Sequence, residues 1–106
     1  MKEIKSKEEL EQLNNEHKQY IIEYGVPDTC IPCKLTKENL ELFENENRFD
    51  LEYFSCSDVN IISELGFTSI PVLQLVTESN VVLLNDSSVS MDEEELNDWL
   101  KINIGE

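Results

Sequence analysis

Residues 20–33, with the sequence YIIEYGVPDTCIPC, decide both the fold and the chemistry expected of this 106-residue chain. The apolar, β-rich run Tyr20–Tyr24 is followed by glycine and proline, which predicts a buried central strand. Cys30 and Cys33 come next, spaced so that their thiols can share one disulfide across a single turn. Pro32 suits the first turn of a helix, where the amide that proline lacks would have no partner. The stretch therefore indicates dithiol–disulfide chemistry at the start of a helix.

Helical spacing continues after the cysteines and predicts a helix from about Pro32 to Glu46. The residues on its expected buried face are Cys33, Thr36, Leu40 and Phe43. The other patterns predict strands at about residues 2–5, 49–56, 70–76 and 81–84, and helices at about 7–15 and 58–65. A last helix is expected to begin at a capping box formed by Ser90 and Glu93 and to end at Gly105.

The order β-α-β-α-β-α-β-β-α predicts an α/β fold with a mixed sheet and helices on both faces. Right-handed crossovers through the helices at 32–46 and 58–65 are expected to join its parallel strands. A chain of 106 residues fits one domain, residues 1–106, which can bury about two-thirds of its unfolded surface. We therefore expect a single domain that is stable without structural disulfides.

The net charge of −15 limits the partners of the chain, because binding to a nucleic-acid backbone needs a basic surface. Such a field either steers basic protein partners towards the chain or only aids its solubility. No apolar run approaches the roughly 20 residues that cross a bilayer, and the first residues do not resemble a secretory signal. We expect a cytoplasmic monomer that binds neither nucleic acid nor membrane.

Three features together resemble the thioredoxin family over nearly the whole chain. They are the apolar strand with an internal carboxylate, the run Cys30–Lys34 that opens a helix, and the run Gly66–Pro71 that leads into a strand. The resemblance implies the thioredoxin fold and a thiol–disulfide oxidoreductase that reduces protein disulfides. It makes Cys30 the attacking thiol and Cys33 the resolving thiol. It implies that the chain needs no cofactor beyond the Cys30–Cys33 disulfide. It also implies that a thioredoxin-reductase-type protein donates the electrons.

The resemblance also implies which residues bind substrate. In the family the bond before the proline that matches Pro71 is cis, and the backbone of the preceding residue, here Ile70, pairs with an extended substrate segment. A trans proline with a structural role is the alternative. Around the cysteines, Thr29 and Ile31 stand where the family usually has tryptophan and glycine, beside Pro32. The loop at residues 85–90 also lacks the family's glycine, so the substrate range is expected to differ.

Glu23 matches the buried carboxylate that helps to take the proton from the resolving cysteine in the family, where it is usually aspartate. The match is imperfect, because the side chain is one methylene longer and its spacing to Cys30 one residue longer than usual. The family's companion lysine on the next central strand is missing, since no Lys or Arg occurs between Arg48 and Lys101. A desolvated carboxyl without a cation should have a raised pKa. Glu23 is either a general acid/base or an ordinary strand residue that leans towards the surface.

Other interpretations of the cysteines remain open. A structural disulfide is uncommon in a cytoplasmic domain of this size. A zinc site could in principle use the three cysteines and His17, but no second C-x-x-C exists, so we expect no metal. A redox-idle binding module with an acidic surface is the alternative function. We expect Cys56 to be a small core or rim residue, and His17 and Trp99 to lie at the surface and in the core respectively.

Overall fold

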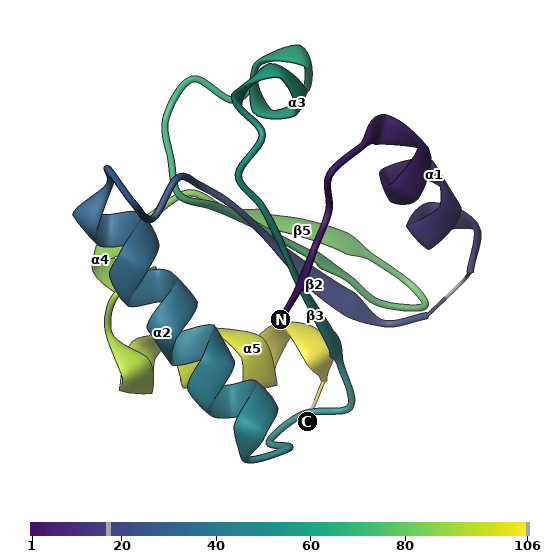
Figure 1. Cartoon of the computed structure of the whole chain (residues 1–106). Coiled ribbons are helices and arrows are strands. Elements are labelled where there is room, and N and C mark those ends of the chain that lie inside the picture. The colour runs from purple at the N-terminus through teal and green to yellow at the C-terminus, as the bar shows by residue number, and fades with distance from the viewer. Residues whose placement is uncertain (17, 106) are drawn as a thin grey trace.

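A computed structural model describes residues 1–16 and 18–105 of the chain, so the expected surface position of His17 lies outside the described residues. A five-stranded sheet lies between two layers of helices (Figure 1). Within the described residues, no helix is both long enough and apolar enough to cross a membrane. The elements in chain order are β1 (Lys2–Glu3), α1 (Lys7–Asn15), β2 (Tyr20–Tyr24), α2 (Ile31–Asn45), β3 (Glu52–Cys56), α3 (Val59–Glu64), β4 (Val72–Val76), β5 (Val81–Leu84), α4 (Ser87–Ser90) and α5 (Glu93–Ile104).

The sheet is mixed, with the strand order β1-β3-β2-β4-β5, which confirms the expected fold class. Strands β1, β3 and β2 are parallel, whereas β4 is antiparallel to β2 and β5 is antiparallel to β4. The expected crossovers are therefore partly wrong, because α1 and α2, not α2 and α3, connect parallel strands. With six residues, α3 is roughly 9 Å long and shorter than a five-residue strand of about 16 Å. It does not return the chain to the opposite end of the sheet, so β4 runs back beside β2.

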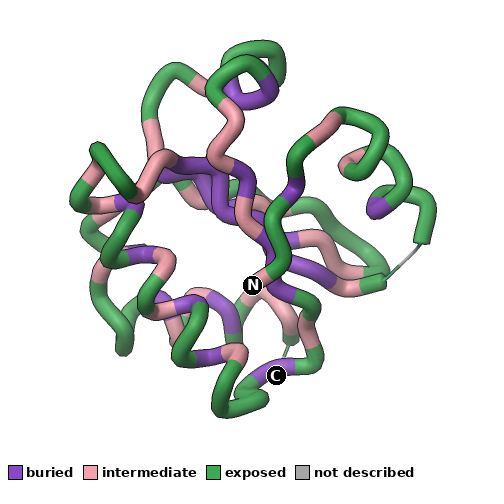
Figure 2. Tube along the Cα trace, viewed as in Figure 1, coloured by how far each residue is buried: buried purple, intermediate pink, exposed green. Residues whose placement is uncertain are grey.

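Two apolar clusters form the core, one on each face of the sheet. Helices α1 and α3 cover one cluster, to which β2 contributes Tyr20, Ile22 and Tyr24. Helices α2 and α5 cover the other, to which β2 contributes Ile21. All five residues of β2 are buried, as expected for a central strand, and Figure 2 shows the buried segments along the sheet and the inner sides of the helices. Since side chains alternate along a strand, Glu23 points to the face covered by α2 and α5.

The ends of most helices follow the sequence signals, but the beginning of α5 does not. The expected capping box of Ser90 and Glu93 is wrong, because Asp92 caps α5 and its side chain accepts a hydrogen bond from the Glu95 amide at 3.0 Å. Ser90 ends α4, a short helix that the sequence patterns missed, and its hydroxyl bonds to Thr36 on α2. Both Asp and Ser are good N-caps, so the spacing alone could not choose between them.

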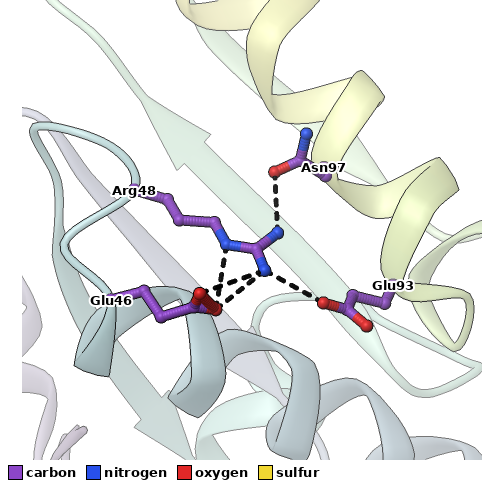
Figure 3. A network of polar contacts seen from close by, with 4 residues as sticks. All are labelled: Glu46, Arg48, Glu93 and Asn97. Atoms are coloured by element: carbon purple, nitrogen blue, oxygen red, sulfur yellow. Dashed lines mark hydrogen bonds and ion pairs between the residues drawn. The ribbon is translucent and has the colours of Figure 1, made fainter.

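The turn between α2 and β3 shortens the expected strand at residues 49–56, which begins only at Glu52. Phe49 lies in the turn and is buried against the ring of Phe43. A buried apolar residue in a turn gives the same sequence pattern as a strand residue, so the strand was predicted to begin too early. Arg48 fixes this turn against α5 through hydrogen bonds to Glu46 on one side and Glu93 and Asn97 on the other (Figure 3). These surface contacts contribute little each, but together they hold the end of α2 beside α5.

Candidate active site at the start of helix α2

Cys30 and Cys33 form a disulfide at the beginning of α2, with their Cα atoms 5.2 Å apart. Cys30 is the N-cap of the helix, and its Sγ accepts a hydrogen bond from the Cys33 amide at 3.2 Å. Pro32 lies in the first turn, where it removes no needed donor. The free amides and the positive end of the helix dipole therefore point at Cys30. In the reduced protein this position favours a thiolate at Cys30 over a thiol.

The two cysteines differ in their access to solvent. Cys33 is fully buried, with 0% of its surface exposed, while Cys30 is partly exposed. The backbone of Gly25 packs closely against the Cys33 side chain. A Cβ atom on Gly25 would lie only 2.8 Å from the Cys33 Sγ. Only a residue without a side chain leaves room there for the Cys33 sulfur. A protein disulfide can therefore approach the sulfur of Cys30 but not that of Cys33.

The residues expected to bind substrate lie in two segments at one end of the sheet, residues 29–32 next to Cys30 in the chain and residues 70–71 before β4, where Ile70 is half-buried and Pro71 is buried. Thr29 and Ile31 are exposed, Ile31 to 73%, and Pro32 is half-buried beside them. The Ile70–Pro71 peptide bond is cis. Val72, the next residue, pairs with Tyr24 at the end of β2. Pro71 therefore lies at the end of the sheet where the chain leaves β2 for the cysteines.

The loop that lacks glycine, at residues 85–90, holds α4 and is joined to its neighbours by hydrogen bonds. The Asn85 side chain donates to the Ser69 hydroxyl at 2.8 Å, one residue before Ile70. The hydroxyls of Thr36 and Ser90, both buried, are 2.8 Å apart. These contacts tie the loop both to the segment before Pro71 and to helix α2. The signal for α4 that the sequence offers is Asp86, whose side chain caps the helix by accepting from the Ser88 amide.

Glu23 is buried near the end of β2, with 2% of its surface exposed, so it does not lean towards the surface. Its Oε2 atom has no hydrogen-bond partner within the part of the chain that the structure describes. A Cβ atom on Gly25 would lie 3.6 Å from the Glu23 Oε2 and 2.8 Å from the Cys33 Sγ. Glu23 and Cys33 therefore border the same space. Burial raises the pKa of Glu23 to about 8, Lys37 lowers it and Glu41 raises it. Near neutral pH this carboxyl exists in both protonated and ionised forms.

A cavity of about 440 Å³ lies beside Glu23, where the chain leaves β2 and β3. Among the residues of this cavity to which sequence reasoning gave no role is Lys37 on α2, its one basic residue within the described part of the chain. Lys37 follows Cys33 by four residues, and residues at this spacing lie on the same side of a helix. That spacing was the signal that could have identified it. The cavity is lined by Glu3, Glu23, Gly25, Val26, Pro27, Asp28, Thr29, Lys37, Ser55 and Ser57.

The third cysteine lies away from the pair. Cys56 ends β3, is fully buried in the cluster under α1 and α3, and has a thiol pKa that burial raises. Cys33 lies on the other side of the sheet, under α2, so the three cysteines do not come together as a zinc site would require. Among residues 1–16 and 18–105, no three or more His, Cys, Asp or Glu side chains are grouped to hold a metal ion. Trp99 is half-buried at the edge of the second cluster.

Solved structures of thioredoxins superpose on the chain along nearly its full length. Mitochondrial thioredoxin 3 of Saccharomyces cerevisiae, in its oxidised form, has a TM-score of 0.73 at 17% identity, over 96% of this chain and 94% of that chain. Fasciola hepatica thioredoxin gives 0.76 at 17% identity, over 96% and 98%. The chain has the thioredoxin fold. A mutant thioredoxin from Halobacterium salinarum gives 0.73 at 17% identity, over 95% and 88%.

The thioredoxin fold expected from the motifs is thus confirmed, although the sequence is only 17% identical to the compared proteins. No family model matches the sequence, and neither does any curated protein. At this level of identity the structural likeness establishes the fold alone. The chemistry of the site has to be argued from the residues of this chain.

Proposed function

We propose that the chain is a thiol–disulfide oxidoreductase that reduces protein disulfides. The observation that carries this proposal is the disulfide between a partly exposed cysteine at the N-cap of α2 and a fully buried one in its first turn. A helix N-terminus favours the thiolate, and the thiolate is the form that attacks a disulfide. A purely structural disulfide has no need of this asymmetry.

The reaction follows from the positions of the two sulfurs. The Cys30 thiolate attacks one sulfur of the substrate disulfide, the substrate S–S bond breaks, and the first substrate thiolate leaves. Cys33 then loses its proton to the ionised carboxyl of Glu23 and attacks the Cys30 sulfur. The mixed disulfide breaks, the second substrate thiolate leaves, and the Cys30–Cys33 disulfide forms. The substrate gains two electrons and the protein loses two.

The oxidised protein must be reduced again before the next turnover. We propose that a thioredoxin-reductase-type donor supplies the two electrons and that the protein works as a monomer in the cytoplasm. The partly exposed Cys30 sulfur is the group that such a donor would reach first. The rim of Thr29, Ile31 and Pro32, with Ile70, would contact both the donor and the substrates, while the buried Pro71 would act through the backbone of Ile70. The exposed Ile31 offers them an apolar contact where a glycine would offer none.

Reduction of a small protein disulfide substrate, with dithiothreitol as electron donor, tests the proposal. Wild type should accelerate the reaction over dithiothreitol alone, and Cys30→Ser should not, because the attacking thiol is lost. A matched control is Cys56→Ser, which removes the buried thiol on the other side of the sheet and should keep the activity. If wild type fails to accelerate reduction although its cysteine pair cycles freely, the redox-idle binding module is the better description.

A further inference from the structure

The cavity beside Glu23 combines a buried acid with a single cation. Of the described residues that line it, Lys37 alone is basic, and Glu23 is the most deeply buried acid. Lys37 is half-buried, and Asp28 and Thr29 at the rim are exposed, so the cavity opens to solvent. Lys37 forms no ion pair with Glu23, because their charged atoms do not come within 4.0 Å. Any influence of Lys37 on Glu23 therefore acts across the cavity.

No other cation among the described residues faces Glu23 from the elements packed around it. Its neighbours in the sheet are Ser55 on β3 and Leu73 on β4, neither of which carries a charge. The other ionisable groups that line the cavity or act on the Glu23 carboxyl are all acids or the buried thiol. They are Glu3 on β1, Asp28 in the loop after β2, Glu41 on α2 and, next to the same space, Cys33 when the disulfide is reduced.

The location of Lys37 links it to the resolving cysteine as well as to the acid. Cys33 and Lys37 lie one turn apart on α2, so both face the strand end where Glu23 lies. The Glu23 carboxyl is 2% exposed and Lys37 is half-buried, so water screens their interaction less than it screens a pair of charges at the surface. Lys37 is thus placed to favour a negative charge where the resolving step needs a proton acceptor.

We propose that Lys37 is a positioning residue for the resolving step, whose charge favours the carboxylate form of Glu23 that takes the proton from Cys33. Its role in turnover rests on the oxidoreductase function proposed above. The cavity supplies the second part of this step, because it extends from Glu23 to the exposed residues Asp28 and Thr29 and so offers a path to solvent. The proton that Glu23 accepts leaves by this path before the next turnover.

A direct test follows the titration of the Glu23 carboxyl by carbon-13 NMR in the oxidised protein, where no turnover is needed. Lys37→Met should move the titration midpoint to higher pH by roughly half a unit to one unit, because a favourable charge is lost. Lys37→Arg should restore the midpoint, since it keeps the charge. Lys34→Met is the matched control, because Lys34 is an exposed lysine of the same helix that does not line the cavity.

Two results would overturn the proposal. One is a Lys37→Met midpoint equal to that of wild type, and the other is a Lys34→Met shift as large as that of Lys37→Met. The resolving rate of a preformed mixed disulfide, measured near pH 7, gives a second readout. It should fall by roughly three- to tenfold in Lys37→Met, in proportion to the ionised fraction of Glu23, and recover in Lys37→Arg. Failure of the wild-type protein to reduce any disulfide would instead contradict the proposed function, independently of the titration.

Discussion

Replacing Glu23 by Gln should stabilise the protein increasingly as the pH rises. The reason is the burial of this carboxyl, which raises its pKa from 4.5 to about 8 in the folded protein. In the unfolded chain the carboxyl ionises near its ordinary pKa, while the folded protein still holds the proton. Because the unfolded state releases its proton first, wild type loses stability as the pH rises from about 4.5 to about 8. Below and above that window this contribution is constant.

The size of the effect follows from the two pKa values. Each pH unit inside the window changes the free energy of unfolding by about 1.4 kcal/mol. Between pH 5 and pH 7 wild type should therefore lose about 2.5 kcal/mol relative to Glu23→Gln, which has no proton to release. A domain of this size is stable by about 5–15 kcal/mol, so the difference is measurable. Glutamine keeps the shape and can still donate and accept hydrogen bonds in the cavity.

Urea unfolding of both proteins at several pH values, with the Cys30–Cys33 disulfide intact, measures this difference. The comparison uses the change with pH rather than the value at one pH, so any constant effect of the amide cancels. Glu38→Gln is a useful control, because it removes an exposed acid of α2 that neither lines the cavity nor shifts the Glu23 pKa, so it should change the pH dependence little. A difference between wild type and Glu23→Gln that stays constant from pH 5 to pH 8 would refute the reasoning.

Three further substitutions test the packing that positions the site. Gly25→Ala should destabilise the oxidised protein by about 1–3 kcal/mol in urea unfolding, because its Cβ would lie 2.8 Å from the Cys33 sulfur; an unchanged stability would contradict this contact. Thr36→Val should lower the free energy of unfolding by about 1–3 kcal/mol, because it leaves the buried Ser90 hydroxyl without its partner. In a double-mutant cycle with Ser90→Ala, the double mutant should lose less stability than the sum of the two single mutants. Asp92→Ala should lower the free energy of unfolding by about 1 kcal/mol, measured by thermal or urea unfolding, because α5 loses its N-cap. An unchanged free energy of unfolding would make Ser90 the candidate cap again.

The sequence predicted the features that depend on neighbouring residues. The run Tyr20–Tyr24 was recognisable as a buried strand because it is apolar throughout, apart from Glu23, and ends at glycine. The place of the cysteine motif at the first turn of α2 was predictable because Pro32 is a local signal for the start of a helix. The last helix ends at Gly105, whose φ of +87° is a conformation that glycine adopts easily.

The features that failed depend on contacts between distant segments. Ser90 has the spacing of a cap, but its hydroxyl is used by Thr36, 54 residues away in sequence. The direction of β4 depends on how far α3 carries the chain, which local patterns do not show. The sequence shows no cation on the strand expected beside Glu23, whereas the structure places Lys37 of α2 at the same cavity as Glu23. Each of these required the packed arrangement of the elements.

Trapping of the mixed disulfide tests most directly whether Cys30 attacks and Cys33 resolves. Cys33→Ser and Cys30→Ser are each incubated with a disulfide-containing protein substrate, and covalent complexes are mapped by mass spectrometry of the linked peptides. Cys33→Ser should accumulate a complex through Cys30, because attack survives while release is lost, and Cys30→Ser should accumulate none. Complexes linked through Cys33 or Cys56, or no complex with Cys33→Ser, would contradict the account.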